Sequence, residues 1–316
     1  MFTKTREFLN GREALVISGL GSYSLTDTFE CGQAFRYECV KSENGYVEYI
    51  TIVGNEIITV GQRTAGELIF YDMTDDVFES VARPYFALDT DFGAIRDDIV
   101  ARTDSEWLKR AAEEAKGVVI LKQDEWEALF SFIVSQNNNI PRIRKIIRQL
   151  AAEYGVNICL QKDIKICPLG KISTAPCEEL CRLCGSCYTF PKACDVAENP
   201  EKMLISKPGF RYKYLLSAAE RVTSGDTNLV KIAEKNSYTH TISELKKILG
   251  VGDKVASCAA LFGFGNLDAF PVDVWMKRAI DTYFDGHLDP ESLGKYAGVA
   301  QQYIFHYIRN LEAKHL

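Results

Sequence analysis

The sequence lacks the long apolar segments that would place a chain in a membrane or direct it out of the cell. None of its apolar runs is long enough to span a bilayer. Residues 1–7 lead into no apolar stretch of signal-peptide length. We therefore expect an intracellular protein without membrane contact, in the cytoplasm or nucleoid, or in the nucleus if the source is eukaryotic.

An excess of positive charge is also missing, because the formal net charge is −6 at pH 7. A protein that holds nucleic acid by electrostatics alone is usually basic, so this balance weighs against that class. It leaves open an enzyme that reads DNA through a local basic surface. Residues 142–148 contain a basic cluster of this kind, although a solvated helix face explains the same cluster.

The 316 residues show no repeat and no low-complexity tract, and they suffice for two domains. β-branched and aromatic residues separated by Gly, Asn and Ser predict an antiparallel sheet in the first third. Helical spacing prevails after about residue 123. We predict an α+β fold with a β-rich domain over residues 1–120 and an all-helical domain over 121–316. The expected strands cover 15–17, 34–37, 46–53 and 56–60, and the expected helices include 76–86, 92–115, 125–135, 212–222, 229–235, 243–249, 254–262, 274–283 and 293–313.

A Gly-Val-Gly turn at residues 250–252 joins two of the predicted helices. Gly250 and Gly252 permit a tight turn and the close approach of another backbone. The second helix has free N–H groups at its start, and such an end attracts phosphate. A packing joint without a ligand is the alternative, and a Gly-x-Gly turn alone would favour it.

Lys254 lies in the first turn of that second helix, where the positive end of the helix dipole disfavours an ammonium. A neutral amine is a nucleophile that can form a Schiff base with the aldehyde carbon of a sugar. Asp273 follows in a Pro-Val-Asp tripeptide and can cap the next helix. The simpler interpretations are an exposed surface lysine and an aspartate that only caps.

The hairpin, Lys254 and the Pro-Val-Asp segment together resemble the helix-hairpin-helix DNA glycosylases, and more narrowly the 8-oxoguanine DNA glycosylases. The resemblance covers most of the chain. It implies that Lys254 is the nucleophile and that Asp273 assists it. Two positions depart from the family pattern, because Leu249 replaces the usual proline and Trp275 stands where the family often has histidine. The contacts of that histidine cannot be transferred to this chain.

The resemblance also assigns a pocket for the damaged base. Gly32, in a Gly-Gln-Ala-Phe-Arg segment, would accept a hydrogen bond from N7–H of 8-oxoguanine. Cys258, one turn after Lys254, would pack on one face of the base. Phe305 would stack on the base, and Gln301 would bind its Watson–Crick edge. Without the resemblance, Gly32 indicates a strand bulge and the last helix is simply amphipathic.

Two further segments resemble family loops that contact the partner strand, at residues 132–142 and 208–214. By position, Asn137 would fill the hole left by an extruded base. Phe210 would be the apolar wedge that stabilises the gap. Arg142 and Arg211 would read the unpaired cytosine, because a guanidinium donates hydrogen bonds and never accepts them.

The ten cysteines, without a secretory signal, indicate a reducing compartment. Four of them are spaced closely enough to bind zinc through thiolates. Positions 177, 181 and 184 also share one helical stripe, and burial as small hydrophobic residues is the interpretation we favour. The 8-oxoguanine group has no metal cysteines in this region, so the cluster is a local elaboration. The four residues are Cys177, Cys181, Cys184 and Cys187.

The predicted function is base-excision repair by a monomeric DNA glycosylase/AP lyase that acts on 8-oxoguanine opposite cytosine in damaged double-stranded DNA. Lys254 attacks C1′ of the flipped nucleotide, and β-elimination then nicks the strand. No cofactor is required; a structural metal at the cysteines and a monovalent or divalent cation at the hairpin are compatible additions. One alternative is a glycosylase for another lesion such as an alkylated base, against which Lys254 argues. Another is a non-catalytic module that binds DNA lesions.

Overall fold

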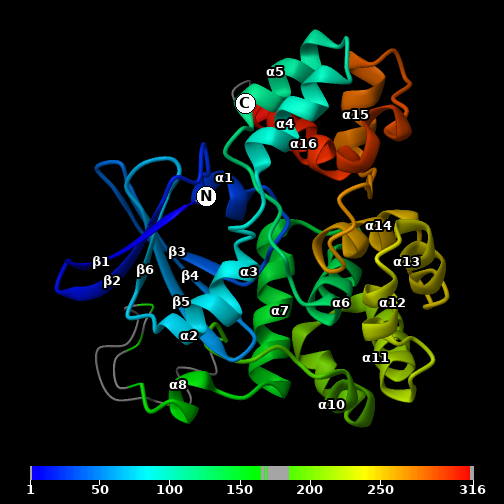
Figure 1. The fold of residues 1–316 in the computed structure, drawn as a ribbon. Helices are drawn as coiled ribbons and strands as arrows, with labels where there is room; N and C mark the ends of the chain where they lie inside the picture. The colour runs from blue at the N-terminus through cyan, green and yellow to red at the C-terminus, as the bar shows by residue number, and fades with distance from the viewer. Residues whose placement is uncertain (1, 165–166, 168, 170–184, 314–316) are drawn as a thin grey trace.

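The computed structural model of the protein describes residues 2–164, 167, 169 and 185–313. Within them the chain forms a six-stranded antiparallel sheet followed by a mainly helical region, which confirms the predicted α+β fold (Figure 1). The strand order is β1-β2-β6-β5-β4-β3. The strands are β1 (Thr3–Leu9), β2 (Arg12–Ser18), β3 (Tyr37–Glu43), β4 (Tyr46–Val53), β5 (Glu56–Gln62) and β6 (Glu67–Tyr71).

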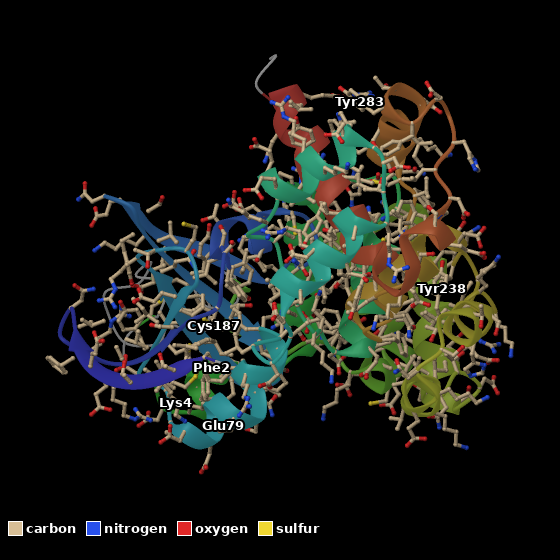
Figure 2. All side chains as sticks on the ribbon, turned by 45° about the horizontal axis from the view of Figure 1, so that its top comes forward. Phe2, Lys4, Glu79, Cys187, Tyr238 and Tyr283 are labelled. Atoms are coloured by element: carbon tan, nitrogen blue, oxygen red, sulfur yellow. The ribbon has the colours of Figure 1, made fainter. Side chains whose placement is uncertain are left out.

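The strand predictions hold for β2, β4 and β5, and they are wrong or missing for the other three strands. The predicted hairpin turn at Gly54 is confirmed, with φ of +58° at that glycine. The strand predicted at 34–37 is wrong for its first three residues, because β3 begins at Tyr37. Strands β1 and β6 were not predicted; the side chains of β1 are mostly polar and exposed on the sheet edge. An ion pair of 3.0 Å between Lys4 and Glu79 ties β1 to the helical turn beside it (Figure 2).

One face of the sheet is covered by short helical segments that follow β6 (Figure 1). They are α2 (Asp75–Val77), a π-helical turn (Phe78–Ala82) and α3 (Arg83–Tyr85). Phe78 and Phe86 are fully buried there against strand residues such as Phe70. A further helix, α1 (Leu25–Glu30), connects β2 to the segment that contains Gly32.

The helical region surrounds a second core. No helix within the described residues is both long and apolar enough to cross a membrane. Its α-helices are α4 (Phe92–Ala101), α5 (Glu106–Glu114), α6 (Glu125–Ser135), α7 (Ile140–Tyr154), α8 (Ile158–Gln161), α10 (Ala193–Glu198), α11 (Tyr212–Ser224), α12 (Leu229–Lys235), α13 (Tyr238–Leu245), α14 (Asp253–Phe262), α15 (Val274–Tyr283) and α16 (Ala297–Ala313), and its 3₁₀ segments are Pro200–Ser206, Gly209–Arg211 and Pro290–Tyr296.

Three of the predicted helices differ from the observed ones, because of local caps in two cases and of the backbone conformation of a glycine in the third. The helix predicted over 92–115 is two helices, because Ser105 accepts from Leu108 N and starts α5. The helix predicted over 243–249 instead begins at Tyr238 behind the cap Ser237, and it ends at Leu245. The helix predicted over 293–313 is interrupted at Gly294, whose φ of +69° and ψ of −153° are not helical.

Helices α4 and α5 pack beside α15 and α16 although they precede the rest of the helical region in sequence (Figure 1). The extended segment after α5, residues 118–121, places its side chains alternately in the two cores. Val118 and Ile120 belong to the helical core, and Val119 and Leu121 belong to the sheet core. This segment is where the sequence predicts the domain boundary.

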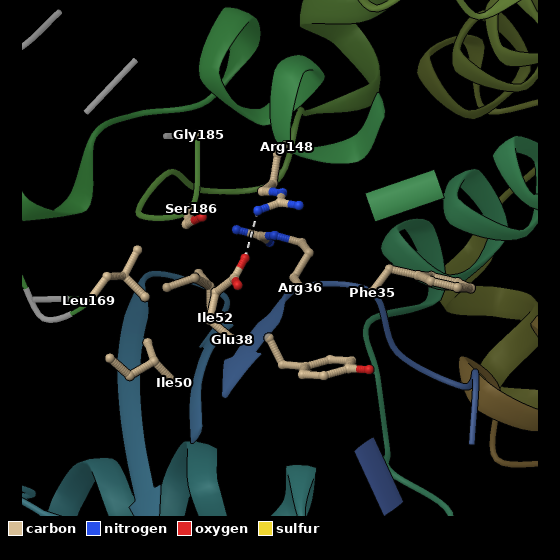
Figure 3. Close-up of a pocket in the computed structure, with 10 residues that line it drawn as sticks. Phe35, Arg36, Glu38, Ile50, Ile52, Arg148, Leu169, Gly185 and Ser186 are labelled. Atoms are coloured by element: carbon tan, nitrogen blue, oxygen red, sulfur yellow. Dashed lines mark hydrogen bonds and ion pairs between the residues drawn. The ribbon is translucent and has the colours of Figure 1, made fainter. Parts of the chain in front are cut away.

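Ion pairs join β3 and the residues before it to the helices (Figure 3). Arg36 pairs with Glu127 of α6 at 3.0 Å, and Arg148 of α7 pairs with Glu38 at 2.7 Å. The Arg144 guanidinium lies over the Tyr37 ring at 4.2 Å. Burial raises the pKa of Glu127, and the neighbouring Arg36 partly offsets this effect. These contacts fix the segment at 32–37 against the helical region.

Candidate functional site

A cavity of about 860 Å³ lies between the Gly32 segment, the start of α7, the start of α14 and the start of α15. Its walls therefore come from segments that are far apart in sequence. The structure brings six of the predicted site residues together in this wall, namely Gly32, Asn137, Gly252, Lys254, Asp273 and Phe305.

The hairpin before α14 uses its two glycines differently. Gly250 has a φ of +78°, and a Cβ at this position would come within 2.3 Å of the Tyr214 ring. Gly252 is the N-cap of α14 with a φ of −95° and no side-chain cap, and a Cβ there would meet no atom within 4 Å. Internal packing therefore requires Gly250 to be glycine, whereas the space above Gly252 is open to an external ligand.

Lys254 enters the cavity from the first turn of α14. Its Nζ donates to Ser135 Oγ at 3.2 Å and lies 5.3 Å from the centre of the Phe132 ring. Within the described part of the chain, no carboxylate lies within ion-pair distance of this amine. The amine also affects Cys258: burial raises the pKa of the Cys258 thiol, and Lys254 opposes that rise. The amine is thus held by neutral groups beside an open cavity.

Asp273 caps α15, as the sequence predicts. Its Oδ1 accepts a hydrogen bond from Met276 N at 2.9 Å. The cap fixes the carboxylate at the cavity wall, close to the start of α14. A rigid carboxylate beside an amine can stabilise positive charge on a reacting group.

Gly32 has a φ of +82° and faces Phe305, since a Cβ here would lie 3.7 Å from the Phe305 ring and 3.6 Å from Ile140. The neighbouring Gln33 side chain is fully buried and holds this turn in place. Its amide donates to Thr28 O and Val119 O, and it accepts from Leu121 N at 2.8 Å. Gly32 and Phe305 therefore form opposite sides of a narrow part of the cavity.

Two predicted pocket residues, Cys258 and Gln301, are buried and do not line the cavity wall. Gln301 accepts from Gln302 Nε2 at 2.8 Å through its Oε1. Cys258 contacts the cavity through Lys254, as the effect of that amine on its thiol indicates. Their roles toward a damaged base stay predictions.

Arg211 is buried and donates to three backbone carbonyls. Its Nε and Nη2 donate to Gln136 O, its Nη2 also donates to Asn137 O at 2.8 Å, and its Nη1 donates to Pro208 O at 3.2 Å. Burial, followed by the charge of Arg142, lowers the pKa of Arg211. Arg211 thus clamps the turn that contains Asn137, which has a positive φ of 48°.

The two other residues predicted to contact DNA here are accessible. The Phe210 side chain is 48% exposed and stacks with the Arg211 guanidinium at 4.5 Å. Arg142 is exposed in the first turn of α7, where Asn139 caps the helix. Arg142, Phe210 and Arg211 do not line the cavity that contains Lys254, which fits a separate site for a partner strand.

Two residues of the site were missed from the sequence. No role was predicted for Ser135, which lies in the segment at 132–142, although it is the hydrogen-bond partner of Lys254. No role was predicted for Gln33 either, and its buried amide is the reason that Gly32 is held in place. No sequence signal distinguishes either residue from an ordinary loop or helix-end polar residue.

The predicted cysteine cluster lies mostly outside the described residues, since Cys177, Cys181 and Cys184 are not among them. Cys187 is described and is buried next to Cys159 (Figure 2). A hydrogen bond from Cys187 lowers the pKa of Cys159. Among the described residues, no group of three or more His, Cys, Asp or Glu side chains could hold a metal ion.

The chain is similar to known proteins in sequence and in structure. Residues 17–129 match the family model "8-oxoguanine DNA glycosylase, N-terminal domain". The N-glycosylase/DNA lyase of Saccharomyces cerevisiae is 27% identical over 274 residues, which cover 80% of this chain and 66% of that protein. The chain thus spans about two thirds of the yeast relative.

Solved structures match over almost the whole chain. MBOgg1 in complex with a low-affinity DNA ligand is 32% identical, with a TM-score of 0.81 and coverage of 99% of both chains. The Clostridium acetobutylicum 8-oxoguanine glycosylase/lyase, bound to double-stranded DNA with cytosine opposite 8-oxoG, is 29% identical, with a TM-score of 0.80 and coverage of 99% and 98%. On these grounds the chain belongs to the 8-oxoguanine DNA glycosylase family.

Proposed function

We propose that this protein excises 8-oxoguanine from double-stranded DNA and then cleaves the strand, with Lys254 as the nucleophile of both steps. The glycosylase and lyase activities follow from the family to which the chain belongs. The observation that carries the residue assignment is the Lys254 amine in an open cavity beside Asp273, with no carboxylate partner among the described residues.

The cavity supports a reaction in which the flipped nucleotide enters next to Gly32 and Phe305. Lys254 Nζ bonds to C1′ of the sugar as the N-glycosidic bond breaks, and the base leaves with the bonding electron pair and takes up a proton. Asp273 stabilises the positive charge that develops on the sugar. Ring opening then converts the adduct into a Schiff base.

Strand cleavage follows from the same intermediate. Loss of a proton from C2′ and departure of the 3′ phosphate complete a β-elimination, and hydrolysis releases the lysine. The open backbone at Gly252 and the start of α14 support phosphate binding next to the reacting nucleotide. A monovalent or divalent cation at the hairpin carbonyls would assist that contact, and the chemistry described here does not require it.

Borohydride trapping on a duplex with 8-oxoguanine opposite cytosine tests the lysine mechanism. Borohydride reduces the Schiff base and leaves a covalent protein–DNA adduct. We expect this adduct with the wild type and none with Lys254→Gln. Absence of the adduct in the wild type, or an undiminished adduct in the variant, would show that Lys254 is not the nucleophile.

We also propose that cytosine is the preferred partner base. Asn137 and Phe210 would occupy the space that the flipped nucleotide vacates, and Arg142 and Arg211 would read the cytosine edge. Single-turnover rates on duplexes with C, A, G or T opposite the lesion test this preference. Equal rates for the four duplexes would contradict the proposed preference for cytosine.

The spacing of the cysteine cluster is compatible with a structural metal. The spacing of its four cysteines permits thiolate coordination of zinc, and none of the catalytic steps uses it. Metal analysis of the purified protein tests this site. One equivalent of zinc that is lost when the cysteines are replaced by serine supports a structural metal, and a metal-free folded protein excludes it.

A further inference from the structure

Ser135 occupies the last residue of α6, between the nucleophile and the turn that contains Asn137. Its Oγ accepts a hydrogen bond from Lys254 Nζ at 3.2 Å and donates its own proton to Phe132 O at 2.7 Å. A hydroxyl has a single proton, so toward Lys254 this oxygen acts only as an acceptor. The contact therefore holds an N–H of Lys254 and leaves the lone pair of the neutral amine free to attack.

The backbone that directly follows Ser135 is the part of the chain that Arg211 clamps. The guanidinium donates to the carbonyl of Gln136 and to that of Asn137 at 2.8 Å. Gln136 is the C-cap of α6. The position of Ser135 Oγ is consequently linked by one residue of backbone to the carbonyls that Arg211 holds.

Four of the five N–H donors of Arg211 bind backbone carbonyls in the described structure, so a partner base that draws on Nε or Nη2 competes with the carbonyls of Gln136 and Asn137. Ser135 is bonded directly to Gln136, so a shift of the Gln136 carbonyl would be passed on to Ser135 at the end of α6. The Lys254 side chain has Ser135 as its hydrogen-bond acceptor, so its amine follows that movement.

On the basis of the proposed function, we propose that Ser135 is a positioning residue that couples the recognition of the opposite base to the Lys254 nucleophile. Arg211 bound to the correct partner base sets the turn at 136–137, and Ser135 transmits that geometry to the amine. An incorrect partner base leaves the amine poorly aligned with C1′ while the lesion can still bind.

A double-mutant cycle in Ser135 and Arg211 tests the coupling. The measurements are DNA affinity and single-turnover adduct formation on duplexes with C or A opposite 8-oxoguanine. We expect Ser135→Ala to lower the rate opposite C about tenfold, as loss of the one hydrogen bond that orients the amine predicts. Its DNA affinity should change less than about twofold, because the Ser135 hydroxyl is bound to Lys254 and to Phe132 O and carries no charge for a phosphate. Ser135→Thr should restore the rate, since it keeps the hydroxyl.

If the two residues are coupled, Ser135→Ala should also reduce the ratio of the rate opposite C to the rate opposite A. Adding Ser135→Ala to Arg211→Ala should then lower the rate opposite C little further. Ser131→Ala is the matched control on the same helix, because Ser131 does not line the cavity. Additive losses, an unchanged C to A ratio or a wild-type rate in Ser135→Ala would each overturn the coupling. The proposed function is judged separately by Lys254→Gln, which must lose the adduct whatever Ser135 does.

Discussion

Gly250 and the Tyr214 ring are packed so closely that a methyl group on this glycine would lie 2.3 Å from the ring carbons. The contact joins the hairpin to α11, which begins directly after Phe210 and Arg211. Gly252, two residues later, makes no such contact. The hairpin therefore has one glycine that serves the fold and another that is free to serve a ligand.

Exchanging each glycine for alanine should separate these two roles. Gly250→Ala should lower the free energy of unfolding by about 1–3 kcal/mol, because it overpacks the joint. Gly252→Ala should leave stability within about 0.5 kcal/mol and weaken DNA binding about tenfold through lost backbone contact with phosphate. Denaturant unfolding and DNA titration of both variants provide the measurements. Equal DNA affinity of Gly252→Ala and the wild type would contradict the assignment of Gly252.

Asp273 has a structural and a chemical role, and two substitutions distinguish them. Asp273→Asn keeps an oxygen that can accept from Met276 N, so its stability should match the wild type within about 0.5 kcal/mol. It loses the charge beside Lys254, and we expect base release to slow about a hundredfold. Asp273→Ala should lose activity and also about 1 kcal/mol of stability. Wild-type base release by Asp273→Asn would show that the aspartate only caps.

Arg211 and Arg142 should differ in their effect on the free protein. Arg211→Ala removes the donors to several backbone carbonyls and should cost about 1–3 kcal/mol of stability. Arg142→Ala removes an exposed side chain and should leave unfolding unchanged. Both should reduce the preference for cytosine in single-turnover assays with C or A opposite the lesion. A stable Arg211→Ala protein would argue that the clamp is not formed in solution.

His306, next to Phe305 on α16, should give the protein a pH-dependent stability. Burial lowers the pKa of His306 below its ordinary value of 6.5, and Asp27, 3.7 Å away, only partly offsets this effect. The unfolded chain therefore takes up a proton first, and this residue destabilises the fold as the pH falls below about 6.5. Guanidinium unfolding at pH 7 and pH 5.5 should show a larger loss for the wild type than for His306→Gln. An identical loss in both proteins would contradict the assignment.

The sequence predicted the elements whose signals are local and missed those set by distant contacts. Asp273 was recognised as a cap because the proline and the helix that follows are adjacent to it. Strand β1 was missed because its polar side chains gain their structure from pairing with β2. Ser135 was missed as a partner of Lys254 because the two residues lie on different helices and meet only in the fold. The hydrogen bonds from Arg211 to the carbonyls of Gln136 and Asn137 could not be predicted for the same reason, because these residues are far apart in sequence.

The alternation of Val118, Val119, Ile120 and Leu121 between two cores has a practical consequence for dissecting the protein. A fragment that ends or starts within this segment leaves each half with unfilled volume where side chains from the other half belong. Neither half would then be a self-sufficient folding unit, whatever its size. Separate expression of the sheet and helical parts should give aggregates, and co-expression of the two fragments should rescue them by complementation. The cavity that contains Lys254 takes its walls from both parts, so these walls form only when the two parts fold together.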